Sequence, residues 1–228
     1  MRASLLALSA LLAWVACRAD PPPFWPDTPL SRLEALALLQ TLNAELLSHD
    51  SATLTLEQWC SSHHLADPAR VIAQRVAGVD KPAGDEQRRL LQVEAGEPVR
   101  YRRVQLTCGG VLLSQADNWY VPSRLSPEMN AALDSSDTPF GRVVQPLHFQ
   151  RHTLSAVLLW QPLPPGWDST SASPPRLPAA DAPARLVIPA AVLEHRAVLM
   201  RPDGTPFSEV IETYSGNVLA FPSPKMLH

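Results

Sequence analysis

The stretch Arg100–Pro122, RYRRVQLTCGGVLLSQADNWYVP, predicts two strands joined by a tight turn. Val104 and Leu106 alternate with polar residues, which is the period of a half-buried strand. Gly109-Gly110 supplies the positive φ angles that a two-residue hairpin turn needs. The stretch therefore predicts a β-hairpin, and the other elements of the chain can be placed around it.

Arg102 has the same parity as Val104 and Leu106, so its guanidinium is expected on the apolar face of this hairpin. A buried cation needs an anionic partner. That partner is either an acidic side chain of the protein itself or a bound carboxylate. Arg103 has the opposite parity and is expected to face solvent.

The first residues have the pattern of a secretory signal, because Met1-Arg2 precedes an apolar run from Leu5 to Ala16. That run is too short to span a bilayer. Cleavage is expected after Ala19, which defines residues 1–19 as the signal peptide. Lipid modification at Cys17 is the alternative, although the residues in front of it form a poor lipobox. We expect a periplasmic or secreted protein without a membrane span after signal removal.

Residues 20–228 are expected to form one soluble domain, given 46% apolar residues and a net charge of −3. The charge distribution shows no basic stripe, so neither nucleic acid nor anionic lipid is an expected partner. No Cys or His spacing suggests a metal site, and no glycine-rich phosphate loop suggests a cofactor. We expect a monomer. The Pro-, Ser- and Ala-rich segment 161–184 is predicted to be an exposed, flexible loop.

Two cysteines, Cys60 and Cys108, remain after removal of the predicted signal. They either form one disulfide in an oxidising compartment or stay as two buried thiols.

Leucine spacing and capping residues predict the helices, and alternation with turn residues predicts further strands. The expected helices are Pro29–Leu47 with a Ser31 and Glu34 capping box, Thr55–Leu65 capped by Thr55, and a short helix from Ser126-Pro127-Glu128 to about Leu133. Segment 67–75 is compatible with helix or strand. The expected strands of the last third are Arg196–Arg201, Phe207–Tyr214 and Val218–Phe221.

Glu212 shares a strand face with Val210 and Tyr214, whereas Glu209 has the opposite parity. If the first face points inward, Glu212 is a buried carboxylate with a raised pKa or a cationic partner, as a general acid requires.

The order of these motifs resembles the bacterial chorismate pyruvate-lyase family. The residues that carry the resemblance are Arg102-Arg103-Val104, Gly110, Val121-Pro122, Asp137-Thr138-Pro139-Phe140-Gly141-Arg142, Arg196, Gly204-Thr205-Pro206 and Glu212-Thr213-Tyr214. The resemblance implies a single α+β domain in which helices pack on an antiparallel sheet of about six strands around an enclosed ligand pocket. The same fold occurs in ligand-binding regions of some transcription regulators.

The resemblance also implies roles for individual residues. Arg102 matches the arginine that binds a substrate carboxylate, and Glu212 matches the catalytic carboxylate. Phe140 matches a pocket leucine, Cys60 falls where the family has an apolar pocket residue, and Arg196 is a candidate for a second substrate carboxylate.

Glu212 aligns with that carboxylate only when the strand contains one extra residue, and otherwise Ile211 takes its place. In this strand Glu209 therefore remains the alternative carboxylate.

Two functions follow from the resemblance. The first is a lyase without metal or cofactor that eliminates pyruvate from chorismate and leaves 4-hydroxybenzoate. The second is an exported, non-catalytic protein that binds a small aromatic or cyclic carboxylate, with Arg102 as anchor and Trp119 or Tyr120 as aromatic wall. A structural module of the cell envelope is a third class that the sequence leaves open.

Overall fold

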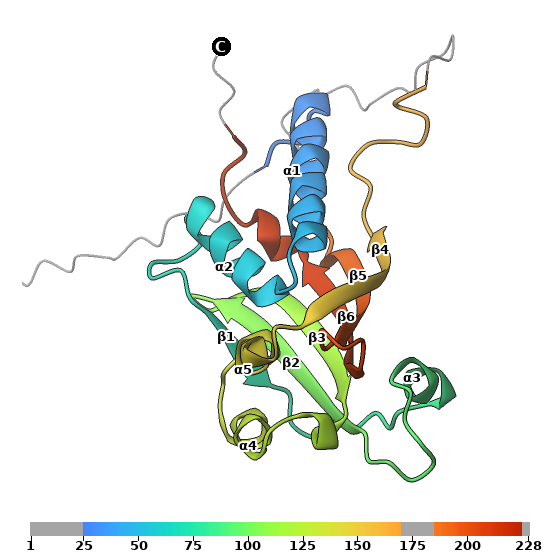
Figure 1. Cartoon of the computed structure of the whole chain (residues 1–228). Coiled ribbons are helices and arrows are strands. Elements are labelled where there is room, and N and C mark those ends of the chain that lie inside the picture. The colour runs from blue at the N-terminus through green and yellow to red at the C-terminus, as the bar shows by residue number, and fades with distance from the viewer. Residues whose placement is uncertain (1–24, 170–184, 225–228) are drawn as a thin grey trace, which may run out of the picture.

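The computed structural model describes residues 25–169 and 185–224, and these form an α+β domain on one antiparallel sheet of six strands (Figure 1). The predicted fold class is confirmed. The strands lie in the order β1-β2-β3-β6-β5-β4. Their bounds are β1 Val71–Arg75, β2 Arg100–Cys108, β3 Val111–Tyr120, β4 Gln150–Leu158, β5 Ala191–Met200 and β6 Pro206–Ser215. The predicted signal peptide and residues 170–184 of the predicted loop lie outside the described residues.

The predicted hairpin is present as β2 and β3, joined at Gly109-Gly110. Both glycines have positive φ, 56° and 83°, as a tight turn between twisted strands requires. Gly109 also packs against Ala66, and a Cβ at this glycine would lie 2.3 Å from the Ala66 Cβ. The turn therefore needs glycine both for its backbone angle and for the space beside it.

Helices cover the two sheet faces unequally (Figure 1). The described helices of six or more residues are α1 Pro29–Ser48, α2 Ala52–Ser62, α3 Asp85–Leu90 and α4 Pro127–Ser135. The buried residues of α1 and α2 join the main core with the face of β2 that carries Val104 and Leu106. Leu91, directly after α3, packs with Trp119 on the opposite face. The face under α1 and α2 is thus the more enclosed one.

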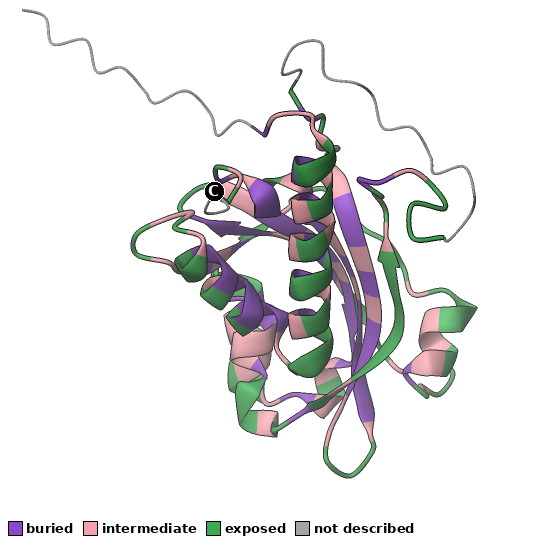
Figure 2. Ribbon diagram, turned by 90° about the horizontal axis from the view of Figure 1, so that it is seen from above, coloured by how far each residue is buried: buried purple, intermediate pink, exposed green. Residues whose placement is uncertain are grey.

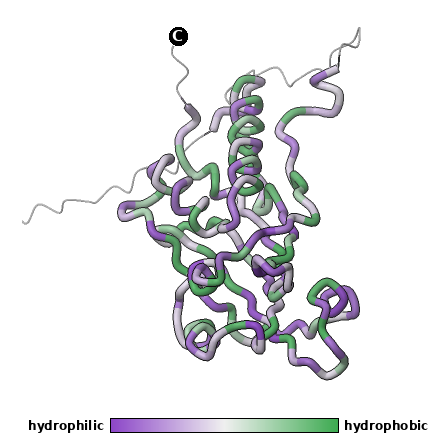
Figure 3. Tube along the Cα trace, in the orientation of Figure 1, coloured by the Kyte–Doolittle hydropathy of each residue, from purple (hydrophilic) through white to green (hydrophobic). Residues whose placement is uncertain are grey.

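Capping residues set the helix starts, and they differ from the prediction at two sites. Thr28 caps α1 by accepting a hydrogen bond from the Ser31 N–H, and Ser51 caps α2 by accepting from the Leu54 N–H. The first helix begins at Pro29 as predicted, but Thr28 caps it instead of Ser31, whereas α2 begins at Ala52, earlier than the predicted Thr55. Leucines occur on the solvent side of α1 as well, so apolar colour runs along much of this helix in Figure 3.

The strand predicted at Val218–Phe221 is wrong, because residues Gly216–Leu219 form a 3-10 helix, η3. Its backbone carbonyls bind indole groups instead of a neighbouring strand. The Trp59 indole N–H donates to the Val218 carbonyl, and the Trp25 indole N–H donates to the Leu219 carbonyl. Segment 67–75, which was open between helix and strand, contains the edge strand β1.

The sequence analysis did not predict strand β4, because this strand is largely exposed along both faces (Figure 2). It forms the sheet edge beside the mostly buried β5. Its register also shifts between Thr153 and Ser155. A strand with an irregular register and little burial lacks the period-2 alternation by which strands are recognised.

Cys60 and Cys108 form a disulfide in the core, where both residues are fully buried. The bond joins the end of α2 to the end of β2 across 48 residues of sequence.

We expect reduction of this disulfide, or replacement of both cysteines by serine, to lower the free energy of unfolding by about 2–4 kcal/mol. The reason is that a loop of this length restricts the unfolded chain strongly. Urea unfolding of oxidised and reduced protein measures the difference. Equal unfolding midpoints for the two forms would contradict a bonded pair.

Candidate functional site

A small pocket of about 40 Å³ lies between the sheet and the first turn of α2. The sheet supplies apolar side chains from four strands, and Phe140 and Phe149 close one side. The complete lining consists of Asp50, Ser51, Ala52, Thr53, Arg102, Val104, Leu106, Ala116, Asn118, Phe140, Gly141, Phe149, Arg151, Leu199, Val210 and Glu212. We call this cavity the inner pocket.

Arg102 enters the inner pocket from β2 and is 3% exposed, on the apolar face that its parity with Val104 predicts. None of its three guanidinium nitrogens has a hydrogen-bond partner within the described residues. Burial lowers the pKa of Arg102, but an arginine stays protonated. A buried and unpaired cation is costly, so this guanidinium is a ready binding group for an anion.

Glu212 lies on the same face and accepts a hydrogen bond from Arg151 at 2.6 Å. Both side chains are nearly buried, with exposed fractions of 8% and 5%. Burial works to lower the pKa of Arg151, but the Glu212 carboxylate outweighs it and the pKa is raised. The Tyr214 hydroxyl also donates to Glu212, at 3.1 Å. Glu212 is therefore the carboxylate of an ion pair and is not an isolated acid.

His195 extends this polar group beneath α1. One of its ring nitrogens lies 2.8 Å from the amide oxygen of Asn43, and the ring meets Tyr214 edge to face at 5.5 Å. Burial, with the nearby Arg151 charge, lowers the pKa of His195 to about 4, and the Glu212 charge opposes this shift. The imidazole is therefore neutral at physiological pH.

His195 predicts how stability depends on pH. Because its pKa is about 4 in the folded protein and about 6.5 when unfolded, the unfolded chain takes up the proton first as pH falls. Stability that is complete above pH 6.5 is then lost toward pH 4, by up to about 2 kcal/mol between pH 7.5 and 5. We expect His195→Gln to remove this loss in urea unfolding, whereas replacing the exposed His152 should leave it intact.

The sequence-predicted residues separate into two groups. Arg102, Phe140 and Glu212 line the inner pocket together. Arg196 lies on the opposite face of the sheet, where it pairs with Glu209 and Glu86.

Cys60, bonded to Cys108, lies in the core outside the lining of the inner pocket. Arg196 is opposite Ile211 in the β5–β6 register and His195 is opposite Glu212. Neighbours in a strand point to opposite faces, which is why Arg196 cannot reach the pocket.

The second cation of the pocket is Arg151, which the sequence analysis missed. It lies on β4, the strand that showed no alternation. The first turn of α2 was missed as well, because the predicted start at Thr55 excluded Ser51–Thr53 from the helix. A Ser-x-x-Leu start at Ser51 is a capping signal that could have placed the positive helix end here.

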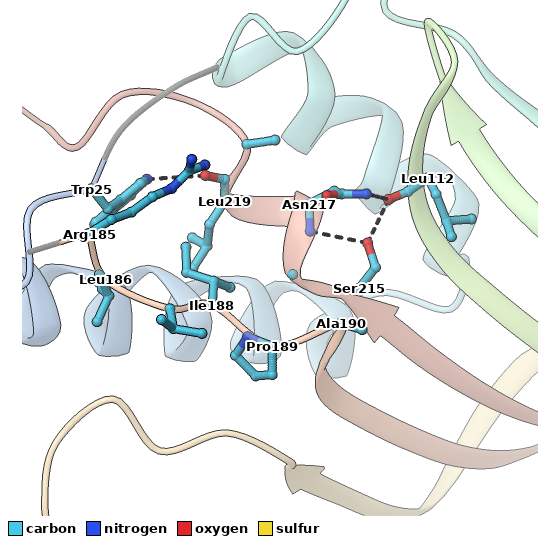
Figure 4. A pocket seen from close by; sticks show the side chains of 13 residues that line it. Trp25, Leu112, Arg185, Leu186, Ile188, Pro189, Ala190, Ser215, Asn217 and Leu219 are labelled. Carbon is cyan, nitrogen blue, oxygen red and sulfur yellow. Dashed lines mark hydrogen bonds between the residues drawn. The ribbon is translucent and has the colours of Figure 1, made fainter. Parts of the chain in front are cut away.

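A groove of about 600 Å³ lies elsewhere, between η3 and residues 185–190 (Figure 4). Its one charged side chain, Arg185, is exposed to solvent, and the other polar side chains bind the protein itself. The Trp25 indole donates to Leu219, and the Ser215 hydroxyl and the Asn217 amide both donate to the Leu112 carbonyl. None of its described side chains has a buried, unpaired polar atom, so the groove lacks a binding group comparable to Arg102.

Within residues 25–169 and 185–224, no three or more His, Cys, Asp or Glu residues gather into a metal site. The same residues contain no helix long and apolar enough to cross a membrane.

Fold and pocket together define an α+β protein with a small pocket that holds a buried arginine, unpaired within the described residues. The chain is 55% identical over 201 residues to the uncharacterized protein y4mC of Sinorhizobium fredii (strain NBRC 101917 / NGR234), an alignment covering 88% of this chain and 83% of that protein. The chain belongs to the same family as y4mC. No family model matches it.

The chain also has low similarity to solved structures. PhnF from Mycobacterium smegmatis has a TM-score of 0.45 at 14% identity, with coverage of 79% of this chain and 70% of that chain. The ligand-binding domain of a putative GntR-family transcriptional regulator from Bordetella bronchiseptica has a TM-score of 0.41 at 15% identity, with coverage of 70% and 90%. Scores below 0.5 at such identities carry no information about ligand or activity.

Proposed function

We propose that this protein binds a small carboxylate-bearing molecule in the inner pocket, with Arg102 as the anchor. The observation that carries the proposal is the buried guanidinium whose three nitrogens have no described partner. A carboxylate can accept two parallel hydrogen bonds from such a group. The positive end of α2 at Ser51–Thr53 adds a second favourable interaction with an anion.

The charge balance of the pocket favours a monoanion. Arg151 and Glu212 neutralise each other, so Arg102 is the uncompensated charge among the buried lining residues. Asp50 lies at the exposed rim, where water screens it. One uncompensated guanidinium matches the charge of one carboxylate.

Titration of carboxylates followed by NMR of the arginine Nε–H groups tests the proposal. We expect acetate to shift the Arg102 resonance in a saturable manner, because acetate is small enough to enter. If no carboxylate shifts that resonance, the proposal is wrong.

Chorismate pyruvate-lyase activity is the second candidate, favoured by the Glu212 carboxylate that borders the same pocket. In that reaction Glu212 would assist proton transfer while the enolpyruvyl group leaves as pyruvate and the ring aromatises to 4-hydroxybenzoate. Chorismate is a dianion, so Arg151 would have to leave Glu212 to bind its second carboxylate. The binding function needs no such exchange, and for that reason we place it first.

Incubation of the protein with chorismate distinguishes the two candidates. Release of 4-hydroxybenzoate and pyruvate in equal amounts would establish the lyase, and their absence is the outcome that we expect. The buried disulfide supports the predicted export, because such bonds persist in oxidising compartments. N-terminal sequencing, which should find a start near Asp20, tests that prediction.

A further inference from the structure

A second pocket of about 550 Å³ lies directly outside the inner pocket. We call it the outer pocket. The two share four lining residues, Asp50, Ser51, Gly141 and Phe149, so they lie next to each other. The outer pocket is otherwise lined by Glu45, His49, Leu54, Thr55, Gln58, Gln145 and His148.

The volumes of the two pockets indicate that each binds a different part of the ligand. About 40 Å³ exceeds the roughly 10–15 Å³ that one water needs, but it is far below the several hundred Å³ of pockets that enclose whole ligands. The inner pocket can therefore take a carboxylate group and little more. A ligand that is larger than a carboxylate group must extend past the shared residues into the outer pocket.

We propose that the natural ligand is a monocarboxylate whose extended tail lies in the outer pocket and is uncharged or carries an amine. The proposal rests on the proposed function, since Arg102 in the inner pocket holds the carboxylate. It adds the second subsite and the chemistry of the part bound there.

The charged residues that line the outer pocket determine which ligand tails it can bind. Glu45 and Asp50 contribute carboxylates, His49 and His148 contribute imidazoles, and the lining contains no lysine or arginine. A second carboxylate on the ligand would find no lysine or arginine to pair with here, which disfavours dicarboxylates. Gln58 and Gln145 offer hydrogen bonds to hydroxyl or amine groups, while Leu54 supplies apolar contact.

Gly141 lies at the junction of the two pockets. A Cβ at this position would lie 3.2 Å from the Ser51 hydroxyl and 3.5 Å from the Thr53 hydroxyl. A side chain at this position would therefore press on the hydroxyls of the first turn of α2. The glycine is not in the left-handed region, so other residues can adopt its backbone angles.

Three probes test the inference: acetate, 5-hydroxypentanoate and glutarate. Glutarate has the same chain length as 5-hydroxypentanoate but carries a second carboxylate. We expect wild-type protein to bind 5-hydroxypentanoate about tenfold more tightly than acetate, and glutarate more weakly than 5-hydroxypentanoate. Calorimetry with NMR of the Arg102 side chain measures each affinity.

Two variants then separate the subsites. Leu54→Trp, at a residue that lines the outer pocket and not the inner one, should weaken 5-hydroxypentanoate binding about tenfold or more and change acetate binding less than about twofold. Glu45→Lys, on the surface of α1, should raise glutarate affinity several-fold. Circular dichroism verifies the fold of both variants.

Each result decides between the proposals. If acetate binds through Arg102 but neither variant changes the order of the three probes, the outer subsite is wrong and the proposed function stands. If wild-type protein binds none of the probes, both fail.

Discussion

Replacing Arg102 by methionine is expected to raise the free energy of unfolding by about 1–4 kcal/mol and at the same time to abolish carboxylate binding. Stability rises because the unliganded protein holds an unpaired cation that is 3% exposed, and an apolar side chain of similar length removes that cost. Binding falls by about 3–5 kcal/mol, at least a hundredfold, because the anion loses its charged partner. Urea unfolding and calorimetric titration with acetate measure the two effects.

The adjacent residue provides the matched control. Arg103 lies on the opposite face, where it donates two hydrogen bonds to Asp117. Arg103→Met should therefore lower stability by about 1–3 kcal/mol and leave carboxylate affinity unchanged. If both variants change the free energy of unfolding in the same direction, Arg102 has a partner in the unliganded protein. That result would remove the basis for an anion site.

Glu212→Gln is expected to cost about 3–5 kcal/mol of stability, because it leaves the buried Arg151 cation without its counterion. The expected effect on ligand affinity has the opposite direction. Removing a negative charge from the pocket should tighten carboxylate binding several-fold, since two uncompensated guanidiniums then face the anion. If the protein is a lyase, turnover should instead fall by about 10²–10⁴-fold.

A double-mutant cycle with Arg151→Met measures the pair itself. We expect the double variant to be at least about 2 kcal/mol more stable than the two single effects predict. Glu209→Gln is the control on the other face, where Arg196 keeps Glu86 as a second partner. If Glu209→Gln alters ligand binding and Glu212→Gln does not, the carboxylate of the site is Glu209.

Local periodicity predicted those parts of the fold that are half buried and regular. The β2–β3 hairpin, the inward positions of Arg102 and Glu212, and the helix that begins after Ser126 all follow from spacing and capping residues. The edge strand β4 did not, because most of its residues are exposed on both faces and its register shifts. Burial creates the alternation by which a strand is recognised, so a strand with little burial leaves little signal.

The membership of the pocket depends on cross-strand register, which a single sequence does not specify. Arg196 was the expected second cation, but the pairing of β5 with β6 places it opposite Ile211, on the other face from the pocket. A shift of one residue in that pairing would have exchanged the faces. The sequence left undecided whether the two cysteines are bonded for the same reason, since nothing local brings Cys60 to the end of β2.

The strand order has a consequence for synthesis of the protein. β6, the last strand along the chain, lies between β3 and β5 in the middle of the sheet. While the ribosome is still making residues 206–215, the inner edges of β3 and β5 have no partner, and both halves of the sheet present open backbone. The inner pocket also lacks Glu212 until then. We therefore expect the domain to fold only after release of its C-terminal region, and a chaperone that holds the nascent chain would have these two edges to protect.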